Sequence, residues 1–282
     1  MAPGIAALVL LAALLHSSWN AIAKVIPHRL ASATLISLVF LVSGIVGVAV
    51  FGLPAPAAWP FIIASAALQT VYLILLTVSY KHGDFSQVYP LARGLAVLLV
   101  ALVSVAFLGE HLSPLQLTGV GVVGGSLLAL ALAGTSGKKS NRTGTLFAVA
   151  TGACIAAYSV VDGTGVRESG GPFAYIAWLF LIHGAITPVA CWLIAQDRRE
   201  YVAAMGRHWK LGTLGGVLSM LAYGIVVWAQ NLAPLALVSA LRESSVLLAG
   251  IIGFLIFGER FSKTRMAWTT AAVAGIVALQ LG

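Results

Sequence analysis

The sequence predicts an all-α integral membrane protein whose ten transmembrane helices form two inverted repeats of five helices. Three observations predict this fold class: the composition, the lengths of the apolar runs and a repeated pattern of charged residues. Of the 282 residues, 60% are hydrophobic and only 9% are Asp, Glu, Lys or Arg, whereas about a quarter of the residues in a typical soluble domain are charged. The composition therefore excludes an ordinary soluble protein and a disordered chain.

Ten runs are apolar and long enough to cross a bilayer, for which an α-helix needs about 20 residues. In chain order they cover residues 4–23, 31–53, 59–80, 86–108, 114–134, 145–165, 172–195, 209–229, 233–257 and 264–281. The first run follows Met-Ala-Pro-Gly without a basic segment, so we expect a retained helix rather than a signal peptide. The longest connection extends from Gln196 to His208, which is too short for a soluble catalytic or nucleic-acid-binding domain.

The basic residues predict how the helices are oriented. The sequence has 16 Lys and Arg residues, and all except Arg93, Arg167 and Arg242 lie at connections on one side of the alternating helices. The positive-inside rule therefore places those connections in the cytoplasm and both termini outside, in a plasma membrane such as the bacterial inner membrane. Cys154 and Cys191 fall inside predicted spans, so they indicate neither a disulfide framework nor a metal site.

An internal repeat relates the two halves of the sequence. A shift of 149 residues brings Arg93 onto Arg242 and Gly109-Glu110 onto Gly258-Glu259 without a gap. We predict a first repeat at 1–134, a linker at 135–144 and a second repeat at 145–282. Because five helices is an odd number, the second repeat enters the membrane from the opposite side, as in many secondary transporters.

These motifs resemble a known family. Tyr89-Pro90-Leu91-Ala92-Arg93-Gly94 and Leu108-Gly109-Glu110, with Leu241-Arg242-Glu243 and Phe257-Gly258-Glu259-Arg260 in the second half, are similar to the EamA-type members of the drug/metabolite transporter superfamily. His16-Ser17-Ser18-Trp19-Asn20 in the first helix is similar to the same group. The resemblance implies ten helices in two EamA repeats and movement of a solute, and it leaves the substrate open.

Polar residues recur every three to four positions on the first, third and fourth helices of each half, which predicts a polar cavity inside the bundle. These stripes comprise His16, Asn20 and Lys24; Gln69, Tyr72 and Ser79; Ser86, Tyr89 and Arg93; Thr151, Tyr158 and Asp162; Ser219, Tyr223 and Gln230; and Ser239, Arg242 and Ser245. Aromatic side chains on the same helices can stack on a solute or donate hydroxyl groups. As substrate-binding residues we predict Arg93, Arg242, Tyr89, Trp19, Asn20, His16, Tyr72, Tyr158, Tyr223 and Ser239.

The two arginines within predicted spans are the strongest signal, because a charge at the centre of a spanning helix costs roughly 2.5–3.5 kcal/mol on insertion scales. One interpretation is that Arg93 and Arg242 bind an anionic or zwitterionic solute through bidentate hydrogen bonds. The alternative is packing, with Arg242 paired to Asp162 or Glu243 and Arg93 bonded to backbone carbonyls. Glu243 and Asp162 are candidates either for proton coupling or for structural ion pairs.

Two further groups are predicted to be structural. Glu110 and Glu259 follow glycines at helix ends, where a capping or packing role is expected. Gly121 and Gly125 on the fifth helix, with Ala271, Ala274 and Gly275 on the tenth, predict close helix packing within one chain or between two.

We therefore expect a secondary transporter for a small organic metabolite, such as an amino acid or organic acid, that works by alternating access without ATP hydrolysis. The alternatives are a membrane-embedded enzyme or lipid-handling protein and, among transporters, a cationic drug exporter. We expect no enzymatic activity, since the sequence has no HExxH or GxSxG motif. The expected partners are the solute and the lipid bilayer, with energy from proton coupling or exchange, and we expect no cofactor, metal ion or nucleic acid.

Overall fold

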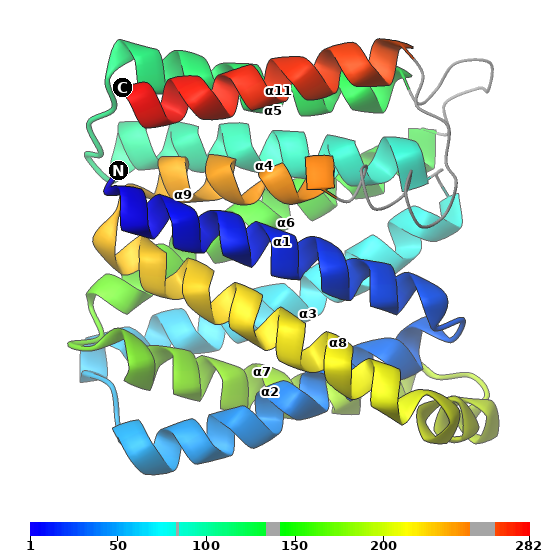
Figure 1. The fold of residues 1–282 in the computed structure, drawn as a ribbon. Helices are drawn as coiled ribbons and strands as arrows, with labels where there is room; N and C mark the ends of the chain where they lie inside the picture. Colours follow the sequence, from blue (N-terminus) through cyan, green and yellow to red (C-terminus); the bar gives the residue numbers. More distant parts are fainter. Residues whose placement is uncertain (83–84, 134–141, 249–262) are drawn as a thin grey trace. The chain divides into compact units, whose positions relative to one another are not determined.

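The computed structural model describes residues 1–82, 85–133, 142–248 and 263–282. Within these residues the fold is all-helical, without a β-strand (Figure 1). The elements are α1 (Pro3–Val25), α2 (Arg29–Phe51), the 3₁₀ turn η1 (Pro56–Ala58), α3 (Trp59–His82), α4 (Phe85–Phe107), α5 (Pro114–Ala133), α6 (Arg142–Arg167), α7 (Pro172–Ile194), α8 (Arg198–Leu232), α9 (Leu235–Arg242) and α11 (Lys263–Leu281).

In the part of the chain that the structure describes, eight helices, α1 to α8, are long and apolar enough to cross a membrane. They coincide with the first eight predicted runs, so the prediction of helices at these positions is confirmed. The tenth run forms α11, whose apolar part covers Met266–Leu281 and is shorter than the other spans.

The predicted loop from Gln196 to His208 is wrong, because α8 already begins at Arg198 and continues for 35 residues. The Asp197 carboxylate accepts a hydrogen bond of 3.0 Å from the backbone N–H of Glu200. This is the usual geometry of a side chain that caps a helix N-terminus. Helix formation needs no apolar residues at an exposed end, so the helix extends into a basic segment that hydropathy assigned to a connection.

The predicted continuous ninth helix, 233–257, is also interrupted. α9 ends at Arg242, Glu243 adopts a turn conformation, and a helical stretch follows at 244–248. The remainder of the predicted helix lies outside the described residues. Glu243 therefore lies at the end of α9, where its N–H is shared between the carbonyl oxygens of Ser239 and Ala240.

The chain divides into two compact units, each of which contains segments from both predicted repeats. Unit 1 consists of Met1–Leu10, Val71–Val160 and Ala233–Gly282, and unit 2 consists of Leu11–Thr70 and Val161–Leu232. Three helices, α1, α3 and α6, contribute residues to both units.

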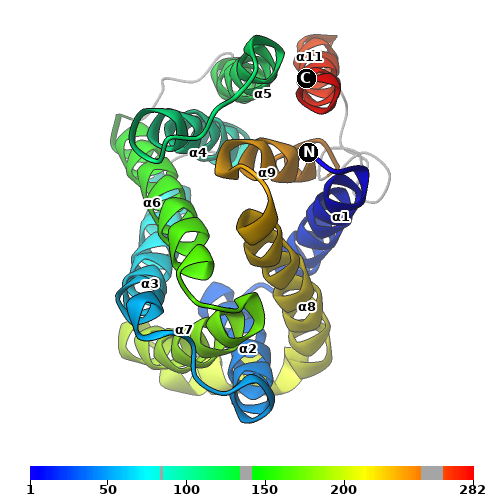
Figure 2. The same ribbon diagram turned by 90° about the vertical axis from the view of Figure 1, so that its left-hand side faces the viewer.

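In unit 1, α5 packs against α4 and α11, and both ribbon views show α5 beside α11 (Figures 1 and 2). A methyl group added at Gly119 would lie 2.8 Å from the carbonyl oxygen of Gly275, so these glycines allow the two backbones to approach closely. Gly121 and Gly125 have no neighbour within 4 Å of such a methyl group. Of the two predicted alternatives for Gly121 and Gly125, packing within the chain is therefore wrong, and packing between two chains stays a prediction. Within the chain, Gly119 lies on the contact face.

In unit 2, α2 packs against α7 and α8. A methyl group added at Gly44 or Gly184 would overlap the backbone of Leu181 or Leu41, respectively, so α2 and α7 are in close backbone contact. The core of this unit is aromatic and aliphatic and includes Phe40, Ile62, Tyr175, Leu179 and Val227.

Candidate functional site

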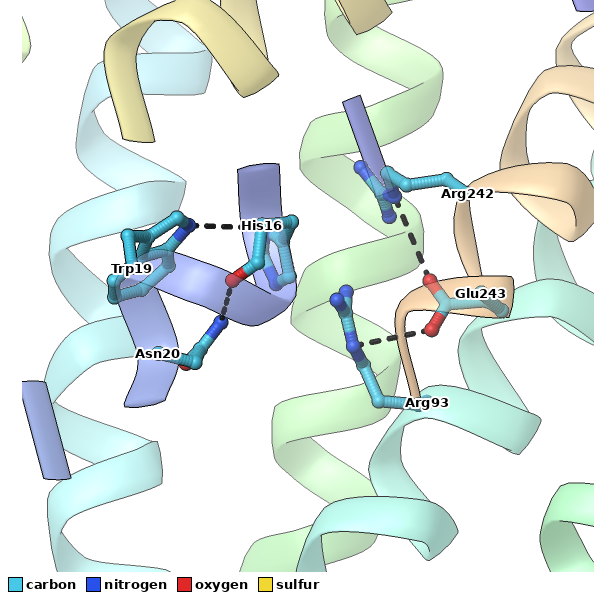
Figure 3. A network of polar contacts seen from close by, with 6 residues as sticks. All are labelled: His16, Trp19, Asn20, Arg93, Arg242 and Glu243. Atoms are coloured by element: carbon cyan, nitrogen blue, oxygen red, sulfur yellow. Dashed lines mark hydrogen bonds and ion pairs between the residues drawn. The ribbon is translucent and has the colours of Figure 1, made fainter. Parts of the chain in front are cut away.

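Two arginines and one glutamate are buried together in unit 1. Arg93 lies within α4, Arg242 is the last residue of α9, and Glu243 follows it; their exposed fractions are 4%, 4% and 1%. Arg93 Nε lies 3.1 Å from Glu243 Oε2, and Arg242 Nε lies 3.5 Å from Glu243 Oε1. Figure 3 shows the carboxylate between the two guanidinium groups. We call these three residues the arginine cluster.

The position of α9 depends on a carboxylate from the end of α4. The carboxylate of Glu110 accepts hydrogen bonds of 2.8 Å from the N–H of Leu235 and 3.4 Å from the N–H of Ala236. These N–H groups have no partner inside α9, because they belong to its first turn. The predicted capping role of Glu110 is confirmed, whereas Glu259 lies outside the described residues. The cap holds the start of a helix whose end carries Arg242.

Tyrosines from three helices belong to the same unit as the arginine cluster. The guanidinium carbon of Arg93 lies 5.6 Å from the ring centroid of Tyr89, which is 8% exposed. The rings of Tyr72 on α3 and Tyr158 on α6 make an edge contact with their centroids 5.8 Å apart. Hydroxyl groups lie on these helices as well, with 3.2 Å between the oxygens of Ser79 and Thr151.

The charges of the arginine cluster do not balance. Two guanidinium groups carry two positive charges, and the single carboxylate carries one negative charge. Burying an ion costs several kcal/mol unless opposite charges and hydrogen bonds offset the lost hydration. Guanidinium groups in such a buried site are chemically suited to bind a carboxylate or a phosphate.

The packing alternative predicts backbone carbonyls as partners of Arg93 and a carboxylate as the partner of Arg242. The structure places Glu243 against both arginines. Shared pairing of this kind is not evident from the sequence, because Arg93 and Glu243 are far apart along the chain.

A second polar cluster occupies unit 2 around Asp162, which is 1% exposed. The Tyr175 hydroxyl donates a hydrogen bond of 3.0 Å to Asp162 Oδ1, and the Tyr223 hydroxyl donates to Oδ2. The Gln69 amide in turn donates to the Tyr223 hydroxyl and to Ser65 Oγ, each at 3.0 Å. This network, which we call the Asp162 cluster, joins residues of α3, α6, α7 and α8.

The predicted residues of α1 form local contacts within their own helix (Figure 3). Trp19 Nε1 donates to His16 Nδ1 at 3.3 Å, and the Asn20 amide donates to the His16 carbonyl oxygen at 2.7 Å. All three side chains are half-buried. The side chains of Lys24 and Ser86 lie outside the described part of the structure.

Sequence reasoning missed Tyr175, which binds Asp162 from α7. The polar residues four positions apart on the seventh run, His183 and Thr187, lie two turns or more beyond Tyr175, and a single tyrosine near a helix end is typical of an interfacial anchor. The hydroxyl on a side chain of zero exposure is the signal that identifies it, and that signal exists only in the folded chain.

Comparisons with known proteins agree with this architecture. A family model described as the EamA-like transporter family matches residues 142–280. A solved crystal structure, titled only as that of a protein, is 20% identical in sequence, with a TM-score of 0.75, and the match covers 99% of this chain and 98% of that chain. No curated protein gives a significant match. The structural match shows a shared fold over the whole chain, and the family match confirms the resemblance of the motifs in the second half. Through residues 142–280 this integral membrane protein belongs to the EamA-like transporter family, within the drug/metabolite transporter superfamily.

Proposed function

We propose that this protein carries a small organic metabolite with a carboxylate or phosphate group across the membrane by alternating access. The arginine cluster carries the proposal, since it buries two guanidinium groups against one carboxylate. A buried site with excess positive charge favours an anionic solute over a neutral or cationic one. The predicted connections are too short for a nucleotide-binding domain, which supports transport without ATP hydrolysis.

The proposed binding residues of unit 1 are those within or around the arginine cluster. They are Arg93, Arg242, Tyr89, Tyr72, Tyr158 and Ser239. The arginines would bind the charged group of the solute, and the tyrosines would supply ring faces and hydroxyl donors. His16, Trp19, Asn20 and Tyr223, which belong to unit 2, stay predictions for contact with the solute.

The proposed architecture is the pair of inverted repeats, 1–134 and 145–282, joined by a linker at 135–144. Its support is the alignment of Arg93 with Arg242 and of Gly109-Glu110 with Gly258-Glu259. In such repeats the solute binds near the midplane of the membrane. We also propose a plasma membrane location with both termini outside, which the distribution of Lys and Arg supports.

Energy for net movement comes from the solute gradient, from exchange or from proton coupling in this proposal. Asp162 and Glu243 are the candidate proton carriers. Uptake into liposomes with an imposed proton gradient separates the three sources. If Asp162 carries the proton, Asp162→Asn abolishes the stimulation by the gradient and leaves solute exchange intact.

The test is uptake of labelled amino acids, organic acids and sugar phosphates into liposomes that contain the purified protein. Arg93→Lys and Arg242→Lys should each reduce uptake at least tenfold, because lysine keeps the charge and loses the planar fork of guanidinium donors. The matched control is Arg207→Lys, at an exposed arginine that pairs with Glu200. The control should transport like the unmodified protein.

Unchanged uptake in both cluster variants would reject the arginines as solute ligands. If the liposomes move only cationic drugs, and move them equally in all variants, the protein is a drug exporter. Conversion of a lipid without transport of any solute would favour the membrane-embedded enzyme.

A further inference from the structure

We infer that Glu243 is an internal ligand of the arginine pair, which the transported anion displaces. The inference rests on the proposed function and adds how the empty site is stabilised. Glu243 presents the same chemical group as an organic acid to the same two guanidinium groups. In the empty carrier, the Glu243 carboxylate therefore occupies the arginines that the substrate would bind.

The geometry of the two ion pairs favours exchange. Each arginine contacts Glu243 through Nε, at 3.1 Å for Arg93 and at 3.5 Å for Arg242. The second distance exceeds the range of about 2.7–3.2 Å for an N–H···O hydrogen bond. The strongest arginine–carboxylate pairs use two parallel N–H···O bonds from one guanidinium. A free anion can adopt this bidentate arrangement, whereas a carboxylate shared between two Nε atoms does not.

Charge counting also favours a bound anion. The empty arginine cluster has a net charge of +1, in side chains that are at most 5% exposed. Binding of a monoanion makes the cluster neutral while Glu243 keeps its own negative charge. Displacement therefore needs no loss of Glu243 from the site, only a shift of its carboxylate away from the guanidinium groups.

Buried donors remain for the incoming anion. Among the described residues, Arg242 Nη2 and the hydroxyls of Ser239, Ser244 and Ser245 are buried without a hydrogen-bond partner. Ser239 lies one turn before Glu243, and Ser244 and Ser245 directly follow it. A buried donor without a hydrogen-bond partner destabilises the empty site, so a ligand that accepts such a hydrogen bond is favoured.

The backbone at Glu243 permits the shift. Glu243 lies in the turn between α9 and the helical stretch 244–248. Its N–H lies 3.3 Å from the Ser239 carbonyl oxygen and 3.2 Å from the Ala240 carbonyl oxygen. Because Glu243 lies at the end of α9, its carboxylate can move by rotation about the side-chain bonds while these backbone hydrogen bonds are kept. Discontinuous helices are a common way to place binding groups in transporters.

The experiment measures anion binding to the purified full-length protein, by thermal unfolding with increasing succinate, glutamate or inorganic phosphate. The variants are Glu243→Gln and Glu243→Asp, and the matched control is Glu200→Gln, which alters an exposed carboxylate that pairs with Arg207. Without anions, Glu243→Gln should unfold at a lower temperature, since its two arginines lose their partner. Added anion should raise the unfolding temperature of Glu243→Gln. The anion concentration that gives half of the full increase should be at least tenfold lower for this variant than for the unmodified protein.

Glu200→Gln should respond to anions like the unmodified protein. The double variant with Arg242→Gln and Glu243→Gln should not show the tighter anion binding that is expected of Glu243→Gln alone. Equal or weaker binding of the same anion by Glu243→Gln overturns the inference. If Glu243→Gln does not fold, Glu243→Asp provides the test. Its shorter side chain holds the carboxylate farther from the arginines, so it should compete less with the anion, and half-saturation should need an anion concentration at least threefold lower than in the unmodified protein. An equal or higher concentration overturns the inference.

The two levels of the proposal fail differently. Equal binding of anions by the unmodified protein and by Glu243→Gln would overturn only the inference that Glu243 is an internal ligand. If no anion binds any variant and none is transported in liposomes, the anion carrier and the internal ligand are rejected together.

Discussion

At the Asp162 cluster, two phenols bind one buried carboxylate. Tyr175 and Tyr223 reach it from α7 and α8, and Gln69 on α3 positions Tyr223. Each donor occupies an oxygen that water would otherwise hydrate. Hydrogen bonds to a charged group contribute about 1.5–3 kcal/mol each, so we expect the network to stabilise unit 2 in addition to any part it has in transport.

Tyr175→Phe tests this role. Removal of the hydroxyl leaves the ring in the core and takes one donor from Asp162, so the free energy of unfolding should fall by about 1.5–3 kcal/mol. Unfolding in a detergent titration measures the change. Tyr72→Phe is the control, because the described ring contact of Tyr72 with Tyr158 is kept, and its loss should be clearly smaller. Equal losses in the two variants would count against a stabilising hydroxyl at Tyr175.

At the scale of the elements, capping and glycine contacts explain the helix boundaries and pairings. Asp197 precedes α8 and caps it, and Asp197-Arg-Arg-Glu200 has the spacing of a helix start. This signal was present in the sequence, but hydropathy alone assigned the segment to a loop. In contrast, the break in α9 at Glu243 has no local signal, because neither glycine nor proline lies there.

The contact between α5 and α11 gives a prediction with a matched control on one helix. Gly119→Ala should lower the free energy of unfolding by about 1–3 kcal/mol, as overpacking does. Its methyl group would lie 2.8 Å from the Gly275 carbonyl oxygen and 2.9 Å from Leu279 N. Gly121→Ala meets open space and should be neutral or stabilise the helix by up to about 1 kcal/mol. Equal effects of the two changes in the same unfolding titration would contradict this packing.

At the scale of the whole molecule, the family indicates the function and the charge distribution predicts the orientation. The family match identifies a membrane transporter, and the basic residues predict the side on which each connection lies. At 1.5 Å per residue the 35 residues of α8 make about 52 Å of helix, more than the roughly 30 Å of hydrocarbon. Figure 1 shows α8 bent near its beginning, and we expect its basic first turns at the membrane surface.

Cysteine labelling tests the orientation. Arg199 and Glu168 are exposed, whereas the native Cys154 and Cys191 are buried and should give little background. In intact cells a membrane-impermeant maleimide should label Glu168→Cys and not Arg199→Cys. Arg199→Cys should react only after the membrane is permeabilised. The reverse pattern would show that the chain is inserted with its termini inside.

Hydropathy by itself determined that the chain is helical and membrane-embedded, because a bilayer requires spans of one length and excludes most charges. The rarity of those charges made Arg93, Arg242, Glu243 and Asp162 recognisable as candidates, and their motifs identified the family. The rotation of each helix about its axis could not be predicted in this way, because it depends on the shapes of the neighbouring helices. In α5 this rotation places Gly119, and not Gly121, against α11.

Only the tertiary structure decided which groups meet. Glu110 caps a helix 125 residues later in the chain, and Tyr223 binds Asp162 across 61 residues. The pairing of both arginines with Glu243 likewise depends on a helix break and on the contact between α4 and α9. Such partners come from distant parts of the sequence, and a buried charge meets them only when the whole chain has folded.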